Sequence, residues 1–203
     1  MVDRLVYLCQ YKQNRLRDVF MSKKRDLLLS TALELFYRHG INSIGINEVI
    51  KVSGVAKKTL YSHFNSKEDL VLRALEQRHL TFMQWLEAKL ENTTNNSELV
   101  DTLFHALKGW FDGHEPELGD FNGCFFINTS AEFHDNKSEI SNYCRFHKAQ
   151  VRQLIQNKLS KDSDDLLNAI CLLKEGAITT AYMTGASSEV IKNSVKILRR
   201  LEC

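Results

Sequence analysis

The chain has 203 residues, of which 43% are hydrophobic and 26% are charged, and its formal net charge is +2. This composition describes an ordinary soluble globular protein, long enough for one or two domains and a substantial core. One proline and nine glycines leave little room for a strand-rich fold with its many turns, so we expect an all-α protein.

No apolar run approaches the roughly 18 residues of a membrane helix, so we expect no membrane partner and a cytoplasmic location. The apolar patch near the N-terminus, Leu5 to Cys9, is shorter than the roughly 7–15 residue core of a secretory signal. A natural start of translation is Met21, which would make residues 1–20 an upstream extension. The alternative is a genuine N-terminal arm, and in either case residues 1–22 precede the first domain.

The net charge averages two unlike parts of the chain. Residues 1–75 contain 13 Lys and Arg against 7 Asp and Glu, whereas residues 76–203 contain 14 against 18. A basic N-terminal third beside an acidic remainder is expected of a DNA-binding head on a body that does not bind DNA.

The first two predicted helices cover about residues 25–39 and 46–53. The apolar residues of the first share one face and Gly40 ends it. We expect an apolar spine in the second, formed by Ile46, Val49, Ile50 and Val52. Gly54 can then adopt the positive φ angle of a helix end, which predicts a tight turn into the next helix.

The third predicted helix, residues 57–64, has two unlike faces. Leu60 and Phe64 form its apolar stripe, and lysines, hydroxyls and an imidazole occupy the other face. Ala56, in its N-cap position, caps poorly. A short helix with one buried stripe and one face of donors suits the DNA major groove, so the pattern predicts a helix-turn-helix.

Three consecutive segments carry a family resemblance: LLLSTALELFYRHG, GINEVIKVSGVAKKTLYSHF and NSKEDL. From about Lys24 to Arg73 the chain resembles the DNA-binding domain of the TetR/AcrR family of bacterial transcriptional regulators. The resemblance implies a helix-turn-helix domain over residues 23–70 and a helical effector-binding and dimerisation domain over residues 71–203. Gly45 departs from the commonest family pattern, which has Thr or Ser there, so one phosphate contact is not expected.

The resemblance also implies which residues contact double-stranded DNA. Lys57, Lys58 and Thr59 are expected at base edges, because family members reach the bases from this part of the helix. Further residues are expected near phosphates: Tyr61, His63, Lys67, and the basic arm of Lys23, Lys24 and Arg25. The alternatives are that Tyr61 and His63 only pack the small domain and that the arm is a solvated charge cluster.

A long helix capped by Ser66 should connect the two domains. Five more helices are predicted, about nine in all, at residues 98–113, 122–134, 137–160, 163–184 and 187–201. The segment GCFFINTSAEF is similar to a helix of some family members. In the resembled family the last two helices pair with those of a second copy, although their apolar spacing also permits an internal core contact.

Among the many aromatic residues of the body, mixed polar and aromatic character makes four the candidates for an effector pocket: Trp110, Phe126, Tyr143 and His147. The alternative is that they are plain core. Glu132, His134 and His147 could supply metal ligands, but no His-x-x-x-His spacing exists, so we expect no metal and no cofactor. The five cysteines show no Cys-x-x-Cys pair and are expected to be reduced.

The leading hypothesis is a homodimeric repressor that a small-molecule effector releases from a palindromic operator. One alternative is a DNA-binding architectural protein without an effector, which would have a solid core. The other is a metalloenzyme built on a helical bundle. We expect no enzyme, because glycine-rich phosphate loops and Gly-x-Ser-x-Gly are absent from the sequence.

Overall fold

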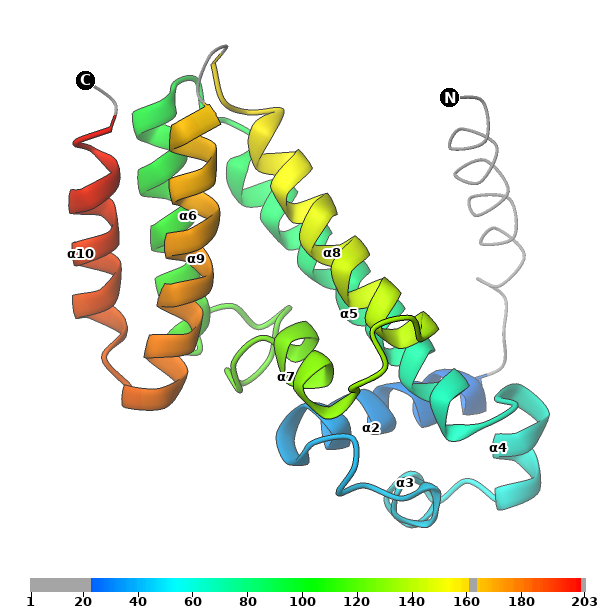
Figure 1. Ribbon diagram of the computed structural model, residues 1–203. Helices are drawn as coiled ribbons and strands as arrows, with labels where there is room; N and C mark the ends of the chain where they lie inside the picture. Colours follow the sequence, from blue (N-terminus) through cyan, green and yellow to red (C-terminus); the bar gives the residue numbers. More distant parts are fainter. Residues whose placement is uncertain (1–22, 161–163, 202–203) are drawn as a thin grey trace, which may run out of the picture.

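A computed structural model describes residues 23–160 and 164–201 of the chain, so the hypothesis of a start at Met21 lies outside the described residues. The described residues form helices and no strand, which confirms the all-α prediction (Figure 1). The nine helices are α2 (Lys23–His39), α3 (Ile46–Ser53), α4 (Lys57–His63), α5 (Lys67–Leu90), α6 (Asn96–Phe111), α7 (Phe125–Glu132), α8 (Glu139–Gln156), α9 (Asp164–Thr184) and α10 (Ser187–Leu198).

The helices follow the predicted order, and their ends are set by caps. α6 begins two residues before the predicted residue 98, because the side chain of Asn95 accepts a hydrogen bond from the backbone N–H of Glu98. Ser138 caps α8 in the same way through the N–H of Ser141. The first N–H groups of a helix have no hydrogen-bond partner within the helix, and a side-chain acceptor at the N-cap supplies one. The cap therefore decides at which residue the helix begins.

The head consists of α2, α3 and α4 around a small core that contains Leu28, Phe36, Val49 and Leu60. Val52 was predicted in the apolar spine of α3, and this prediction was wrong, because 55% of Val52 is exposed. Val52 lies two residues after Ile50, a rotation of about 200° around the helix, and therefore on another face.

The longest helix, α5, runs from the head into the body, where it lies beside α8 (Figure 1). Its first buried residues, Leu70 and Val71, follow the cap at Ser66, and α5 packs against α2. Farther along, Phe82, Trp85 and other buried side chains belong to the body. One continuous helix therefore contributes to both parts of the molecule.

Three helices, α6, α9 and α10, lie side by side at the end of the body away from the head (Figure 1). Ile191 and Leu198 of α10 are buried in this group. The outward faces of α9 and α10 expose large apolar side chains, most of all Leu172 and Met183, each 76% exposed. Of the helices in the described ranges, none is long and apolar enough to cross a membrane.

We predict that Ser66→Ala lowers the free energy of unfolding by about 1 kcal/mol, because it removes the oxygen that accepts the N–H of Asp69 at 3.1 Å. Urea unfolding followed by circular dichroism measures this change. Ser30→Ala is the matched control: Ser30 lies within α2, its hydroxyl bonds back to the carbonyl of Leu27, and alanine favours a helix interior. Equal losses in both variants would contradict the capping role.

Candidate DNA-binding surface and body cavities

The turn between α3 and α4 has the predicted geometry. Gly54 has a φ of 67°, and its N–H donates to the carbonyl of Ile50 at 3.0 Å. Left-handed backbone of this kind favours glycine, and here it ends α3. As the sequence indicated, neither Gly45 at the start of α3 nor Ala56 at the start of α4 provides a side-chain cap.

The outward face of α4 carries the polar side chains that the sequence placed there. Leu60 is fully buried and anchors the helix. Lys57 and Lys58 are exposed, and 47% of Tyr61 is exposed, whereas Thr59 is half-buried. The first turn of α4 therefore presents two ammonium groups to solvent from a helix whose other side is fixed in the core.

The remaining predicted DNA contacts differ from one another in their surroundings. Lys24 is exposed, while Arg25 is half-buried with its guanidinium 5.5 Å from the centre of the Phe64 ring. His63 is half-buried and its ring lies edge-on to the same phenylalanine. The ammonium of Lys67 donates to the carbonyl of Ile41 at 2.6 Å. Lys67 thus holds a loop of the head, a role that the sequence did not indicate.

The head meets the body at Tyr37. Its hydroxyl donates to the carbonyl of Gly123 at 2.8 Å and accepts from the N–H of Asn122 at 3.0 Å. The guanidinium of Arg78 lies 4.8 Å from the centre of the Tyr37 ring. Burial raises the pKa of Tyr37 to about 12, so the hydroxyl stays protonated and donates.

A second junction is formed by Glu132, the last residue of α7. Its two carboxylate oxygens accept the backbone N–H groups of Ile41 and Asn42 at 2.9 and 2.6 Å. A side-chain carbon added to Gly40, where φ is 81°, would lie 3.3 Å from the same carboxylate. The loop between α2 and α3 is therefore held directly by a helix of the body.

Two of the predicted pocket residues, Phe126 and His147, stack inside the body with ring centres 3.5 Å apart and planes 7° apart. The Nδ1 atom of His147 lies 3.0 Å from Nδ1 of His79, so one of the two nitrogens donates and the other accepts. Burial, together with the nearby charge of Lys148, lowers the pKa of His147 far below its ordinary value. His147 is a neutral core histidine.

Trp110 shares a small void with Phe126 and His147, and Tyr143 packs against His79 outside it. The void measures about 10 Å³, which is room for one water molecule at most. All four predicted residues are buried. They pack in the core of the body, and their role as effector contacts stays a prediction.

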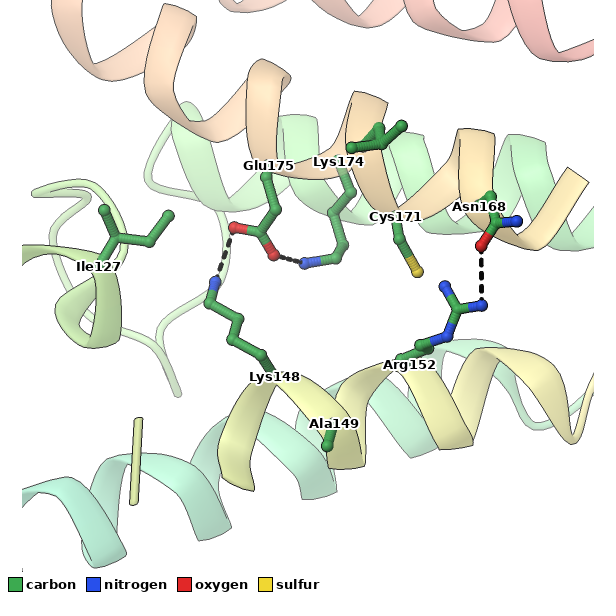
Figure 2. A pocket seen from close by; sticks show the side chains of 9 residues that line it. Ile127, Lys148, Ala149, Arg152, Asn168, Cys171, Lys174 and Glu175 are labelled. Carbon is green, nitrogen blue, oxygen red and sulfur yellow. Dashed lines mark hydrogen bonds and ion pairs between the residues drawn. The ribbon is translucent and has the colours of Figure 1, made fainter. Parts of the chain in front are cut away.

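A larger space, about 590 Å³, lies between α8 and α9. Figure 2 shows Lys148 of α8 and Lys174 of α9 on either side of the Glu175 carboxylate. The distance from the Lys148 ammonium to that carboxylate is 2.6 Å. Burial by itself would raise the pKa of Glu175, yet the charges of Lys174 and Lys148 hold it below its ordinary value.

This charged cluster was missed by sequence reasoning, although the sequence contains a signal for it. Lys148 lies four residues after the buried Cys144 and three before the buried Val151, on the apolar stripe of α8. Lys174 likewise follows the buried Ile170 by four residues in α9. A lysine in register with a buried stripe lays its aliphatic stem along the apolar surface, so its ammonium needs either solvent or a charged partner, which here is Glu175.

The metal alternative finds no support in the described part of the chain, where no group of three or more His, Cys, Asp or Glu side chains could hold an ion. Glu132 is engaged with the head, and His134 is exposed. His147 lies instead in the aromatic core beside Phe126.

Comparison with known proteins finds a family model that matches the head. Residues 28–74 match the family model described as bacterial regulatory proteins, tetR family. The chain is 28% identical over 137 residues to the HTH-type transcriptional repressor ComR of Escherichia coli. The aligned segment covers 66% of this chain and 63% of ComR. It is 32% identical over 90 residues to the HTH-type transcriptional activator FasR of Mycolicibacterium smegmatis, 44% of this chain and 40% of FasR. The chain thus spans less than two thirds of either relative.

Solved structures extend the likeness of fold to nearly the whole chain. A TetR-family transcriptional regulator from Streptomyces coelicolor superposes with a TM-score of 0.80 at 22% identity and covers 93% of each chain. The reduced form of NemR from E. coli gives a TM-score of 0.74 at 21% identity, over 88% of this chain and 96% of NemR. At such identities the likeness establishes the fold.

We predict that acid destabilises the protein through His147. Because its pKa is depressed in the folded state, the unfolded chain binds the additional proton below about pH 6.5, and the free energy of unfolding then falls by up to about 1.4 kcal/mol per pH unit. Urea unfolding between pH 7.5 and 5 measures this slope. His147→Gln should flatten it, and His114→Gln, at an exposed position, should not. A slope unchanged in His147→Gln would contradict the assignment.

Proposed function

The chain belongs to the tetR family of bacterial regulatory proteins, and we propose that it is a homodimeric transcriptional repressor that a small molecule releases from a palindromic operator. The observation that carries this proposal is α4, a short helix anchored by Leu60 with lysines on its open face, within the segment that matches the family. Such a helix fits the major groove.

Within this proposal, the side chains of α4 divide by role. Lys57, Lys58 and Thr59 in its first turn reach base edges, where lysine can donate to guanine O6 and N7. Tyr61 and His63 contact phosphates, with Lys24 and Arg25 of α2 beside them. The ammonium of Lys67 already donates one hydrogen to the carbonyl of Ile41, so only its other hydrogens can reach a phosphate. Lys67 therefore contributes least to DNA binding among these residues.

A second copy of the chain is the proposed occupant of the outward face of α9 and α10. The space along this face measures about 620 Å³ and includes the small residues Gly176 and Ala177, which permit a close approach of helices. Exposed Leu172, Met183 and Ile197 would be buried by pairing around a two-fold axis. Two heads related by that axis would bind half-sites separated by whole helical turns.

Release of DNA requires that the effector bind more tightly to a state in which the heads no longer match the operator. The junctions at Tyr37 and Glu132 support such coupling, because they tie the head to the loop before α7 and to α7 itself. Repression rather than activation is proposed by analogy with ComR, which aligns over more of its length than the activator FasR.

An architectural DNA-binding protein without an effector is the second candidate, because the void lined by Trp110, Phe126 and His147 has room for one water molecule at most. The space of about 590 Å³ between α8 and α9 favours a ligand-responsive protein instead. The two candidates differ in DNA binding: a repressor selects a palindrome from a random-sequence pool, whereas an architectural protein enriches no shared motif.

We predict that Lys57→Ala combined with Lys58→Ala weakens binding to the selected DNA at least about 20-fold. The reason is that each lost base contact costs roughly 1–3 kcal/mol. Fluorescence anisotropy with labelled DNA at physiological salt measures the change. The matched control is Lys192→Ala combined with Lys196→Ala on α10, which removes the same charge away from the head. Equal weakening by both pairs would show a charge effect only and would contradict the assignment of α4.

We predict that Leu172→Glu combined with Met183→Glu converts the dimer to a monomer, because two copies of each carboxylate would face each other in an apolar contact. Light scattering after size exclusion should change from twice 23.4 kDa to 23.4 kDa. Val52→Glu, at an exposed apolar position on α3, is the control and should remain dimeric. A dimer that persists in the double variant would place the interface elsewhere.

A further inference from the structure

Cationic side chains gather where the space between α8 and α9 meets the core. That space and the small void behind it are both lined by Lys148 and Lys174. The charged side chains that line one or the other are four cations and one carboxylate: Arg78, Lys148, Arg152, Lys174 and Glu175. The lining therefore carries an excess of three positive charges.

The internal partners of these cations do not balance the charge. Glu175 accepts hydrogen bonds from both Lys148 and Lys174, so one carboxylate serves two ammonium groups. Lys148 also donates to the thiol of Cys124 at 3.2 Å. Arg152 donates to the neutral amide oxygen of Asn168 at 2.8 Å (Figure 2).

Arg78 has no carboxylate partner among the described residues, and its guanidinium lies over the rings of Tyr37 and Trp110. Only 6% of Arg78 is exposed, and its Nη1 atom donates to the carbonyl of Leu118 at 2.6 Å. Its Nη2 atom is buried and has no hydrogen-bond partner in the described structure, and Arg78 lines the void. Trp110 Nε1, at the same void, is also a buried donor without a partner. Buried donors and charges left in this condition are costly unless a ligand completes them.

We propose that the space between α8 and α9 binds a small organic carboxylate, held by Lys148 and Lys174 with Arg152 at its mouth. The anion supplies the negative charge that Glu175 alone cannot. This inference deepens the proposed function by naming the chemical class of the effector, and it rests on that function for its effect on DNA.

The rest of the lining suits an apolar body on the ligand. Ile127 of α7 contributes an exposed apolar side chain, and the small residue Ala149 of α8 lines the same space (Figure 2). The volume of about 590 Å³ is within the range of small-molecule sites. Apolar burial would provide affinity, and the charged end would provide orientation.

The position of Ile127 connects this site with the head. Ile127 lies on α7, the helix whose last residue, Glu132, accepts the N–H groups of Ile41 and Asn42. A ligand that displaces α7 would therefore act on the loop between α2 and α3. The site thus lies one helix away from the DNA-binding head.

Calorimetric titration of the full-length protein with matched pairs of probes tests the inference: 1-naphthoate against 1-naphthamide, and octanoate against octanamide. Each pair shares its apolar body and differs in charge. We expect at least one carboxylate to bind with a Kd at least tenfold below that of its amide. Lys148→Gln should remove this preference without changing amide binding, and Lys137→Gln, at an exposed position before α8, should retain it.

Arg152→Gln provides a second variant that does not disturb the buried cluster, because Arg152 is bonded only to Asn168 at the mouth of the space. We expect a loss of carboxylate affinity of about three- to tenfold. Equal affinity for acid and amide, no binding of any probe, or an undiminished preference in both variants would overturn the proposal. Tighter competition by inorganic phosphate than by any carboxylate would overturn the choice of carboxylate.

The titration contains no DNA, so its failure leaves the proposed function intact. Conversely, if the protein binds the carboxylate but selects no DNA motif, the carboxylate site is supported and the proposed role as a regulator is contradicted. When the protein both binds a carboxylate and selects a DNA motif, the carboxylate that binds more tightly should lower the affinity of the native chain for the selected DNA at least tenfold. It should not lower the affinity of Lys148→Gln.

Discussion

The rest of the structure depends on one helix that belongs to both halves of the molecule. α5 has 24 residues, includes neither glycine nor proline, and spans about 36 Å. Its first turn follows α4 directly, and its later turns are buried in the body beside α8. A change in the tilt of α5 relative to the body would therefore change the position of α4.

Two polar junctions hold the head against the body. The hydroxyl of Tyr37 bonds to both Gly123 and Asn122, and the carboxylate of Glu132 bonds to the loop between α2 and α3. Both junctions join the head to α7 or to the residues just before it. The void lined by Trp110, Phe126 and His147 has room for one water molecule at most, so a larger molecule can enter it only by displacing the side chains around it. The space between α8 and α9, about 590 Å³, is far larger than that void.

The sequence predicted the parts of the structure that depend on neighbouring residues. Gly54 ends α3 and Ser66 begins α5, because a turn and a cap are decided within a few residues. Leu60 was correctly placed in the core, but Val52 was not, although its spacing of two residues from Ile50 already puts it on another face of α3.

The contacts that couple the two halves were not predictable in this way. The partners Tyr37 and Gly123 are 86 residues apart, and Glu132 lies 91 residues after Ile41. Lys67, expected at a phosphate, also donates to the carbonyl of Ile41. The charge cluster of Lys148, Lys174 and Glu175 forms only when α8 packs against α9. Side-chain pairs of this kind require the fold before they can be identified.

The most direct measurement of the central claim is capture of sheared genomic DNA from the organism that encodes the chain, washed at physiological salt and sequenced. A regulator whose two α4 helices bind successive major grooves predicts enrichment of one or a few palindromic sites with half-sites one helical turn or a multiple of it apart. Broad, salt-sensitive binding without a shared motif would contradict it, because phosphate contacts alone produce that result.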